Sequence, residues 1–448
     1  MIRKVGLIIC MILAFACSKP GGNNNTPDPG NPGNPGNPGN PNNGSTLAIT
    51  SVTPDKAENG TITITGTGFN STASLNGVQF GSYTASIVSA TTTQIVVNLP
   101  ADLPQGDHDL TVFANNKFVT KTKAFHLISW RVSTFAGTGS AGGVNGPGST
   151  ATFQWPSGMV LDNSGNIYVT DLNRIRKITP QGDVSTVAGS AGSGSIDANG
   201  VNARFSGVTS IVLDAAGNLY VADQMNFTIR KIEPNGDVHT IAGKAGELGN
   251  TNGIGANARF SMPYGLAINN AGTHLVVGDQ SNHIIRQIEL ATNNVTTIAG
   301  NGQSTSADGK GLLAGISGPG SLVYDKDGNL FITEKGGGKV RKMALDGTVT
   351  TVGGSLSVNN MPTHAVLDDD KNLYVTYSGL GKIKKYTPAN VESNFAGNNI
   401  GTGEEEGPAQ TVFITRPEGI AITKDNNGKP FFYISDAFNK KIKKITKE

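Results

Sequence analysis

The chain has 448 residues, which is too long for one ordinary domain and predicts two or three. Only 15% of the residues are charged and 60 are glycine, a balance that favours many turns and short strands. It argues against a helical bundle or a coiled coil. The formal net charge is +2, so the chain lacks the basic footprint of nucleic-acid binding proteins, and we expect no nucleic-acid partner.

Residues 1–16 have the pattern of a secretory signal peptide. Two basic residues precede the apolar run Val5–Ala16, which is too short for a comfortable transmembrane helix. Cys17 follows at once, and this arrangement resembles the lipoprotein signals of Bacteroidetes-type bacteria, although Ala14 stands where a Leu is usual. The resemblance implies a lipid anchor on Cys17 and a location at the outer membrane or cell surface. The alternative is a soluble secreted protein.

Residues 17–46 form a predicted linker. Glycine, asparagine and proline dominate it, with four Gly-Asn-Pro triplets between Gly30 and Pro41. This composition favours an extended, solvated spacer that holds the body of the protein clear of a membrane. Cys10 would leave with the signal peptide, so the mature chain keeps only Cys17. We therefore expect no disulfide, zinc knuckle or catalytic thiol downstream.

Residues 47–128 are predicted to form a small β-sandwich, because short β-patterned runs alternate there with turn signals. The runs are Leu47–Val52, Thr61–Thr65, Ala73–Leu75, Thr93–Leu99 and His108–Phe113. The segments that resemble the IPT/TIG family of immunoglobulin-like domains are Ile49–Pro54, Ile64–Phe69, Leu75–Val78 and Leu103–Gly106. The resemblance implies a spacer or a binding module.

Residues 129–448 contain a sixfold repeat. Each unit holds four β-patterned runs, which is typical of one blade of a β-propeller. The second run of each unit ends at an anchor residue, and the six anchors are Asp171, Asp223, Asp279, Glu334, Tyr377 and Asp436. Because a feature repeated around a ring is usually structural, we expect the anchor carboxylates to accept backbone N–H groups or to pair with an arginine of a neighbouring blade. The arginines concerned are Arg176, Arg230, Arg286 and Arg341.

The number of β-runs predicts how the ring closes. The sixth unit ends after its third run, and one unmatched run, Arg131–Gly137, precedes the first unit. We expect that run to complete the sixth blade and so join the two ends of the propeller. The motifs Gly-Asn-(Ile/Leu)-Tyr-Val-x-Asp and Ile-Arg-Lys-Ile resemble the NHL family. The predicted fold is all-β: a small Ig-like β-sandwich followed by a six-bladed NHL-type β-propeller.

Residues that break the repeat are the candidates for a ligand site, because a ligand lacks sixfold symmetry. The loops between blades and the loops joining second to third strands emerge on one face of a propeller, called the loop face below. The non-repeated residues predicted near the channel opening on that face are Trp155, Tyr264, His364, Arg416 and Glu418. An aromatic ring can stack on a sugar, and Arg416 can offer a planar donor fork to a uronate or sulfate.

No residue pattern in the chain indicates catalysis. The six histidines show no His-x-His or His-Glu-x-x-His spacing, and the chain has no Gly-x-Ser-x-Gly motif. The NHL resemblance includes lyases that use histidine-bound zinc at the channel, where this chain offers only His283 and His364. We assign no catalytic residue, metal or cofactor.

The combined architecture favours a cell-surface, lipid-anchored binding protein whose propeller face captures a glycan. Two alternatives remain open: a polysaccharide lyase or hydrolase acting at the channel, and a scaffold that binds another envelope protein. We expect the chain to be a monomer.

Overall fold

The computed structural model describes residues 46–448, apart from residues 59, 101–102, 105, 354–359 and 399–405. The predicted signal peptide, the linker and Cys17 lie outside the described residues. No helix in the described part is long and apolar enough to cross a membrane. Besides strands, this part contains single-turn 3-10 helices: η1 (Ala73–Leu75), η2 (Gly200–Asn202), η3 (Gln224–Asn226), η4 (Gly255–Asn257), η5 (Gln280–Asn282) and η6 (Gly311–Leu313).

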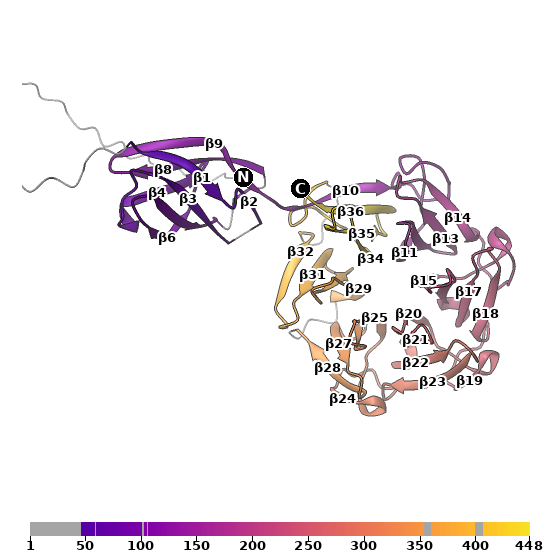
Figure 1. Cartoon of the computed structure of the whole chain (residues 1–448). Coiled ribbons are helices and arrows are strands. Elements are labelled where there is room, and N and C mark those ends of the chain that lie inside the picture. The colour runs from indigo at the N-terminus through magenta and orange to yellow at the C-terminus, as the bar shows by residue number, and fades with distance from the viewer. Residues whose placement is uncertain (1–45, 59, 101–102, 105, 354–359, 399–405) are drawn as a thin grey trace, which may run out of the picture. The chain divides into compact units, whose positions relative to one another are not determined.

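The first β-rich region is a two-sheet sandwich (Figure 1). One sheet has the order β1 (Ala48–Thr53), β3 (Thr61–Thr67), β7 (Gln94–Asn98) and β6 (Ser86–Ala90). The other has the order β2 (Lys56–Ala57), β9 (Lys117–Leu127), β8 (Gly106–Ala114), β4 (Asn76–Phe80) and β5 (Tyr83–Thr84). Alternate residues such as Ile62 and Ile64 on β3 point into a shared core, as a half-buried strand requires.

The predicted strand Ala73–Leu75 is wrong, because these residues form η1. The side chain of Asn76 explains the difference. Its amide donates to the backbone carbonyls of Asn70 and Thr72, so the loop closes on itself instead of extending.

The second region is a ring of six sheets (Figure 1). Blade one contains β11 (Pro156–Leu161), β12 (Ile167–Asp171), β13 (Arg174–Ile178) and β14 (Val184–Gly189). Blade two contains β15 (Val208–Leu213), β16 (Leu219–Asp223), β17 (Thr228–Ile232) and β18 (Val238–Gly243). Blade three contains β20 (Pro263–Ile268), β21 (His274–Asp279), β22 (Ile284–Glu289) and β23 (Asn294–Ala299), with β19 (Gly253–Ile254) outside.

Blade four contains β25 (Pro319–Tyr324), β26 (Leu330–Glu334), β27 (Lys339–Met343) and β28 (Thr348–Val352), with β24 (Gly309–Lys310) outside. Blade five contains β29 (Pro362–Leu367), β30 (Leu373–Tyr377), β31 (Lys382–Tyr386) and β32 (Glu392–Ala396). Blade six contains β34 (Pro417–Lys424), β35 (Pro430–Asp436), β36 (Lys441–Lys447) and β10 (Trp130–Ala136), with β33 (Gly407–Pro408) outside. The inner strands of successive blades contact one another around the whole ring.

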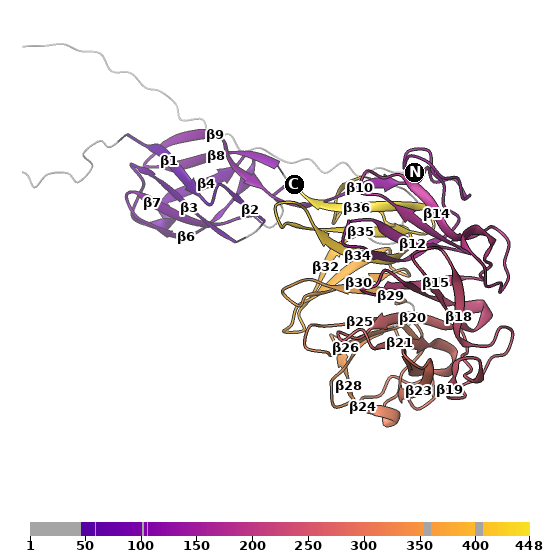
Figure 2. The same ribbon diagram turned by 45° about the vertical axis from the view of Figure 1, so that its right-hand side comes forward.

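Strand β10 closes the ring as the sequence predicts. It pairs antiparallel with β36, with Val132 opposite Ile445, and the two strands lie side by side in both views (Figures 1 and 2). The Trp130 ring packs edge-on against Phe395 of blade five and Phe432 of blade six, with centroids 5.1 and 5.4 Å away. The first strand of the ring therefore seals the seam between its last two blades.

Every inner strand carries a bulge near its start. In blade one, Pro156 is opposite Asp171 but Met159 is opposite Val169, so β11 has one residue more than its partner. At three junctions the third residue of one inner strand is a glycine that lies close to the second residue of a neighbouring inner strand: Gly158 to Thr209, Gly265 to Gly320 and Gly419 to Ser157. A Cβ on Gly265 would lie 1.9 Å from the Gly320 carbonyl oxygen, so a side chain at that position would require the blades to separate.

A buried arginine–carboxylate pair lies at the loop-face end of four blades. The Nη1–carboxylate distances are 3.2 Å for Arg176–Asp171, 2.8 Å for Arg230–Asp223, 3.0 Å for Arg286–Asp279 and 2.6 Å for Arg341–Glu334. Both partners belong to the same blade, so the predicted pairing with a neighbouring blade is wrong. The second and third strands of a blade are hydrogen-bonded neighbours, and this brings the two side chains together.

The carboxylates also accept backbone N–H groups, as predicted. One oxygen of Asp171 accepts the N–H groups of Gln154 and Trp155 at 2.7 Å each. The other end of Arg176 donates from Nη2 to the Val144 carbonyl in the interblade loop. In blade one the pair therefore fixes the interblade loop and also the two residues that immediately precede the inner strand.

The fifth and sixth blades replace this pair. In blade five the hydroxyl groups of Tyr377 and Tyr386 lie 2.5 Å apart. In blade six Asp436 accepts the Asn439 side-chain amide, and the fully buried Lys443 stands where the other blades have arginine.

We expect Arg230→Met to lower the free energy of unfolding by about 3–5 kcal/mol, because it leaves the Asp223 carboxylate buried without its cation. The matched control is Arg259→Met, since Arg259 pairs with the exposed side chain of Glu247 and should cost about 1 kcal/mol or less. Chemical denaturation of the full chain measures both values. Equal losses in the two variants would contradict the structural role of the buried pair.

Candidate functional site

The five predicted ligand residues come together on the loop face. Trp155, Tyr264, Arg416 and Glu418 line a cavity of about 230 Å³ among the starts of the inner strands. The fifth residue, His364, packs against Tyr264 with ring centroids 6.0 Å apart. The cavity is completed by Ser157, Leu172, Gly207, Val208, Thr209, Gln224, Met225 and Lys335.

The repeat itself explains this convergence. Trp155 and Arg416 each precede the first proline of an inner strand, and Tyr264 and Glu418 are each the second residue of one. The anchor Asp171 holds the backbone of Trp155, and Asp436 accepts the backbone N–H of Arg416 at 3.3 Å. Equivalent positions in different blades therefore meet at one opening.

Glu418 is the centre of the polar contacts. It is 3% exposed, and it accepts hydrogen bonds from Arg416 Nε at 2.9 Å and from the Tyr264 hydroxyl at 3.2 Å. Burial and the nearby Glu418 charge raise the pKa of Tyr264 well above its usual value, so its hydroxyl remains a donor at neutral pH. The carboxylate therefore holds two cavity walls in place.

Cations exceed carboxylates among the described residues that line this cavity. The guanidinium carbon of Arg416 lies 5.1 Å from the Trp155 ring centroid, and Lys335 Nζ lies 4.1 Å from the Tyr264 ring centroid. Burial lowers the pKa of Lys335, the charge of Arg416 lowers it further, and Glu418 opposes both effects. With two cations and one carboxylate, the cavity is suited to an anionic group.

Lys335 was not among the five predicted site residues. It follows the anchor Glu334, and the equivalent positions in the other blades are Leu172, Gln224, Gln280, Ser378 and Ala437. Lys335 is the charged member of this set. It therefore breaks the repeat, as we expect of a residue in a ligand site. Gln224 enters the cavity from the same position in blade two.

Tyr264 has a different role from the stacking surface that the sequence suggests. Only 4% of the residue is exposed. The ammonium group of Lys335 lies over its ring, and its hydroxyl donates a hydrogen bond to Glu418. It forms a wall and orients the charged groups. Trp155 is half-buried, and the Arg416 guanidinium lies over its ring.

His364 is a buried neutral base next to these groups. Burial lowers its pKa to about 4, and neither ring nitrogen has a hydrogen-bond partner among the described residues. His283, the other histidine considered for a lyase-type metal site, instead accepts the backbone N–H of Gly318 at Nδ1. His283 therefore makes a local hydrogen bond through its ring, whereas His364 does not.

Comparison with known proteins now assigns the first of the two regions. Residues 47–126 match the IPT/TIG domain. The strands of the IPT/TIG domain are those of the sandwich described above. The chain is also similar to NHL repeat-containing protein 2 of Bos taurus, with 30% identity over 143 aligned residues and coverage of 30% of this chain and 20% of that protein. The Gallus gallus protein of the same name is 34% identical over 149 residues, which are 31% of this chain and 20% of its length.

The chain thus spans about a fifth of the length of these relatives. Two solved structures from Bacteroides thetaiotaomicron share the fold over nearly their full length. One is described as a protein of unknown function, with TM-score 0.54, 18% identity, and coverage of 91% of this chain and 99% of that one. The other is described as an auxiliary nutrient binding protein, with TM-score 0.56, 16% identity, and coverage of 90% and 98%.

The lowered pKa of His364 predicts how the free energy of unfolding changes with pH. The unfolded chain binds a proton at this histidine near its ordinary pKa of 6.5, whereas the folded protein does so only near 4. Stability should therefore fall as the pH drops from about 6.5 to about 4, by roughly 3 kcal/mol from this group.

The variant His364→Gln should lose that part of the pH dependence, as measured by denaturant titrations at pH 7 and pH 4. His239→Gln, at an exposed position, is the matched control and should keep the dependence of the wild type. An unchanged slope in His364→Gln would show that the buried ring does not respond as described.

Proposed function

We propose that this protein is a lipid-anchored surface protein that captures an acidic glycan at the loop-face cavity. The observation that carries the proposal is the meeting of Lys335, Arg416, Glu418 and Trp155 around one cavity at positions where the repeat is broken. A group that only maintained the ring would recur in the other blades, as the anchor pairs do.

The chemistry of the cavity supports a sugar acid. Arg416 uses Nε to bind Glu418, and 39% of its side chain is exposed, so its remaining donors can meet a uronate or a sulfate. The ring of Trp155 can cover the apolar face of a pyranose, while Ser157, Thr209 and Gln224 offer groups for sugar hydroxyls.

The proposed location rests on the N-terminal sequence. A signal peptide, Cys17 and a Gly/Asn/Pro-rich spacer favour a propeller held away from an outer membrane. The fold likeness to a protein described as nutrient binding is in keeping with a surface binding role. The choice of a glycan comes from the cavity alone.

A second candidate function is a polysaccharide lyase at the same cavity. One observation favours it: burial lowers the pKa of Lys335 at the cavity wall, and a neutral amine can accept a proton. A lyase would release unsaturated products from a uronate polymer, whereas a binding protein would retain the polymer unchanged.

The binding proposal is tested with a panel of uronate-rich, sulfated and neutral polysaccharides. We expect retention of at least one acidic polysaccharide by the wild type, without product release. Lys335→Met and Trp155→Ala should each weaken it at least tenfold, about 1.4 kcal/mol. Lys429→Met is the matched control, because Lys429 is exposed in the β34–β35 turn.

Affinity gel electrophoresis at several salt concentrations gives the comparison. The Lys335→Met variant should also lose part of the salt dependence, because one charge contact is removed. Retention that is equal in the wild type and both cavity variants would exclude this cavity as the binding site, and product release by the wild type would favour the lyase.

The anchor proposal has its own experiment. Cys17→Ala should prevent incorporation of a labelled fatty acid and move the protein from the membrane fraction to the soluble fraction. Cys10→Ala is the matched control, because the proposed signal peptide is removed with that residue. If the wild type takes up no labelled lipid, the lipoprotein assignment is wrong.

A further inference from the structure

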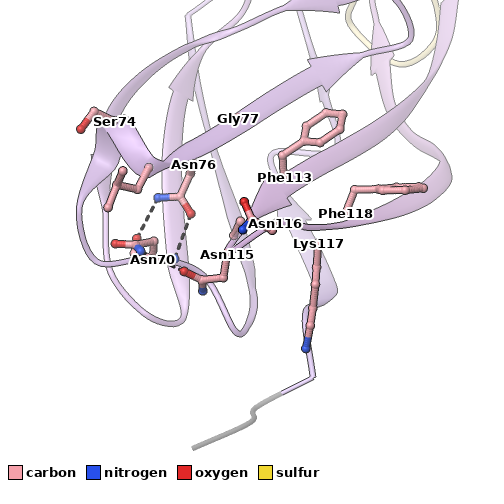
Figure 3. Close-up of a pocket in the computed structure, with 11 residues that line it drawn as sticks. Asn70, Ser74, Asn76, Gly77, Phe113, Asn115, Asn116, Lys117 and Phe118 are labelled. Atoms are coloured by element: carbon pink, nitrogen blue, oxygen red, sulfur yellow. Dashed lines mark hydrogen bonds between the residues drawn. The ribbon is translucent and has the colours of Figure 1, made fainter. Parts of the chain in front are cut away.

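The IPT/TIG domain carries an open cleft at the β8–β9 turn, separate in its lining residues from the propeller cavity. Its volume is about 610 Å³, and its walls come from the η1 loop, the start of β4 and the β8–β9 hairpin (Figure 3). The lining residues are Asn70, Ser74, Leu75, Asn76, Gly77, Phe113, Ala114, Asn115, Asn116, Lys117 and Phe118. No carboxylate is among these described residues.

Two phenylalanines, together with Leu75, which is 61% exposed, give the cleft its apolar surface. Phe113 and Phe118 are cross-strand partners on β8 and β9, with ring centroids 6.0 Å apart and planes tilted by 39°. They are 39% and 70% exposed, although burying a phenylalanine is worth about 1.5–3 kcal/mol. Phe118 in particular keeps most of its surface in water, so a ligand that covered the ring would bury apolar surface that the fold leaves exposed.

The backbone that carries the rings is fixed. Asn115 and Asn116 both have positive φ, 52° and 58°, as the two central residues of a tight hairpin turn require. The Asn115 amide donates to the Gly68 carbonyl, and its oxygen accepts from the Asn70 amide at 3.0 Å. Asn70 also binds Asn76 through its backbone N–H, as Figure 3 shows for this cluster. The cleft is thus organised before a ligand arrives.

One glycine keeps a ring uncovered. Gly77 is directly opposite Phe113 on β4, and a Cβ there would lie 3.4 Å from Phe113 Cβ and Cδ2. Any larger side chain would cover this edge of the ring. Among the lining residues, the side chains of Ser74, Asn116 and Lys117 make no hydrogen bond or ion pair with other described residues.

We propose that this cleft is a second carbohydrate site, which binds an uncharged segment of a glycan. The Phe118 and Phe113 rings would stack on the C–H face of a pyranose, and the Asn116 amide would bind its hydroxyl groups. The site does not depend on the acidic-glycan proposal for the propeller, because the two sets of lining residues share no member.

The lining favours a sugar over a peptide. The wall mixes apolar side chains with the amides of Asn70, Asn76, Asn115 and Asn116 and the Ser74 hydroxyl, so polar groups that suit sugar hydroxyls are interspersed with the apolar surface. A peptide partner of the hydrophobic kind would need a broader apolar surface. Lys117 is the single charged residue of the lining, so the ligand does not need to be an anion.

The experiment uses the full chain and neutral polysaccharides: xyloglucan, galactomannan, laminarin and amylopectin. In affinity gel electrophoresis the wild type should be retarded by at least one of them. Phe118→Ser and Phe113→Ser should weaken that retardation at least fivefold, and Phe118→Tyr should restore most of it by keeping a ring. Val88→Ser is the matched control, an exposed apolar residue on β6 of the other sheet. Circular dichroism and thermal unfolding check the fold of each variant.

Lys335→Met, which alters the propeller cavity, separates the two proposals. Neutral-polysaccharide retardation should be unchanged in Lys335→Met and lost in Phe118→Ser, whatever happens to acidic polysaccharides. Three results would overturn the second site: no retardation of the wild type by the panel, equal retardation of Phe118→Ser and wild type, or loss only in Lys335→Met. Capture of an envelope protein that depends on Phe118, without any polysaccharide effect, would assign the cleft to a protein partner instead.

Discussion

The buried arginine–carboxylate pairs determine the geometry of the loop face. Each arginine reaches in two directions, from the anchor at the end of the second strand to the backbone of the interblade loop. The anchor in turn holds the backbone that starts the inner strand. A buried ion pair is weak evidence for stability, because desolvation of both charges offsets their attraction. Its consequence here is positional: it fixes loops that otherwise have little regular structure.

The candidate site takes residues from blades with and without this pair, since Trp155, Tyr264 and Lys335 belong to blades one, three and four. Blade five supplies His364, and blade six supplies Arg416 and Glu418. In both blades a lysine, Lys384 or Lys443, stands where the other blades have arginine. In blade five the anchor is Tyr377, whose ring centroid lies 5.2 Å from Lys384 Nζ and whose hydroxyl contacts that of Tyr386. Blades one to four therefore share the arginine–carboxylate pair, whereas blades five and six do not. The short contact of Trp130 with Phe395 and Phe432 holds these two divergent blades together.

The sequence was sufficient to predict features that depend on backbone pairing. Alternation along each strand and one unmatched run predicted the closing place of β10, because strand register depends on local pattern and on counting. The same repeat placed Trp155, Tyr264, Arg416 and Glu418 at one opening. It did not show that Arg176 pairs within its own blade, nor that Lys335 covers Tyr264, since both depend on side-chain packing in three dimensions. The Phe113–Phe118 pair was also missed, because exposure cannot be read from strand alternation alone.

The charged groups of the loop-face cavity determine which class of ligand binds there most favourably. Glu418 already binds Arg416 and Tyr264, so it has limited capacity to balance Lys335 as well. A neutral sugar can accept hydrogen bonds from these cations through its hydroxyl oxygens, but it brings no negative charge to offset their desolvation. A uronate or sulfate brings the second negative charge, so both cations can be desolvated with a partner. Selectivity for acidic over neutral glycans at this cavity would then come from the imbalance between Lys335, Arg416 and Glu418, while Trp155 contributes affinity for sugars of either kind.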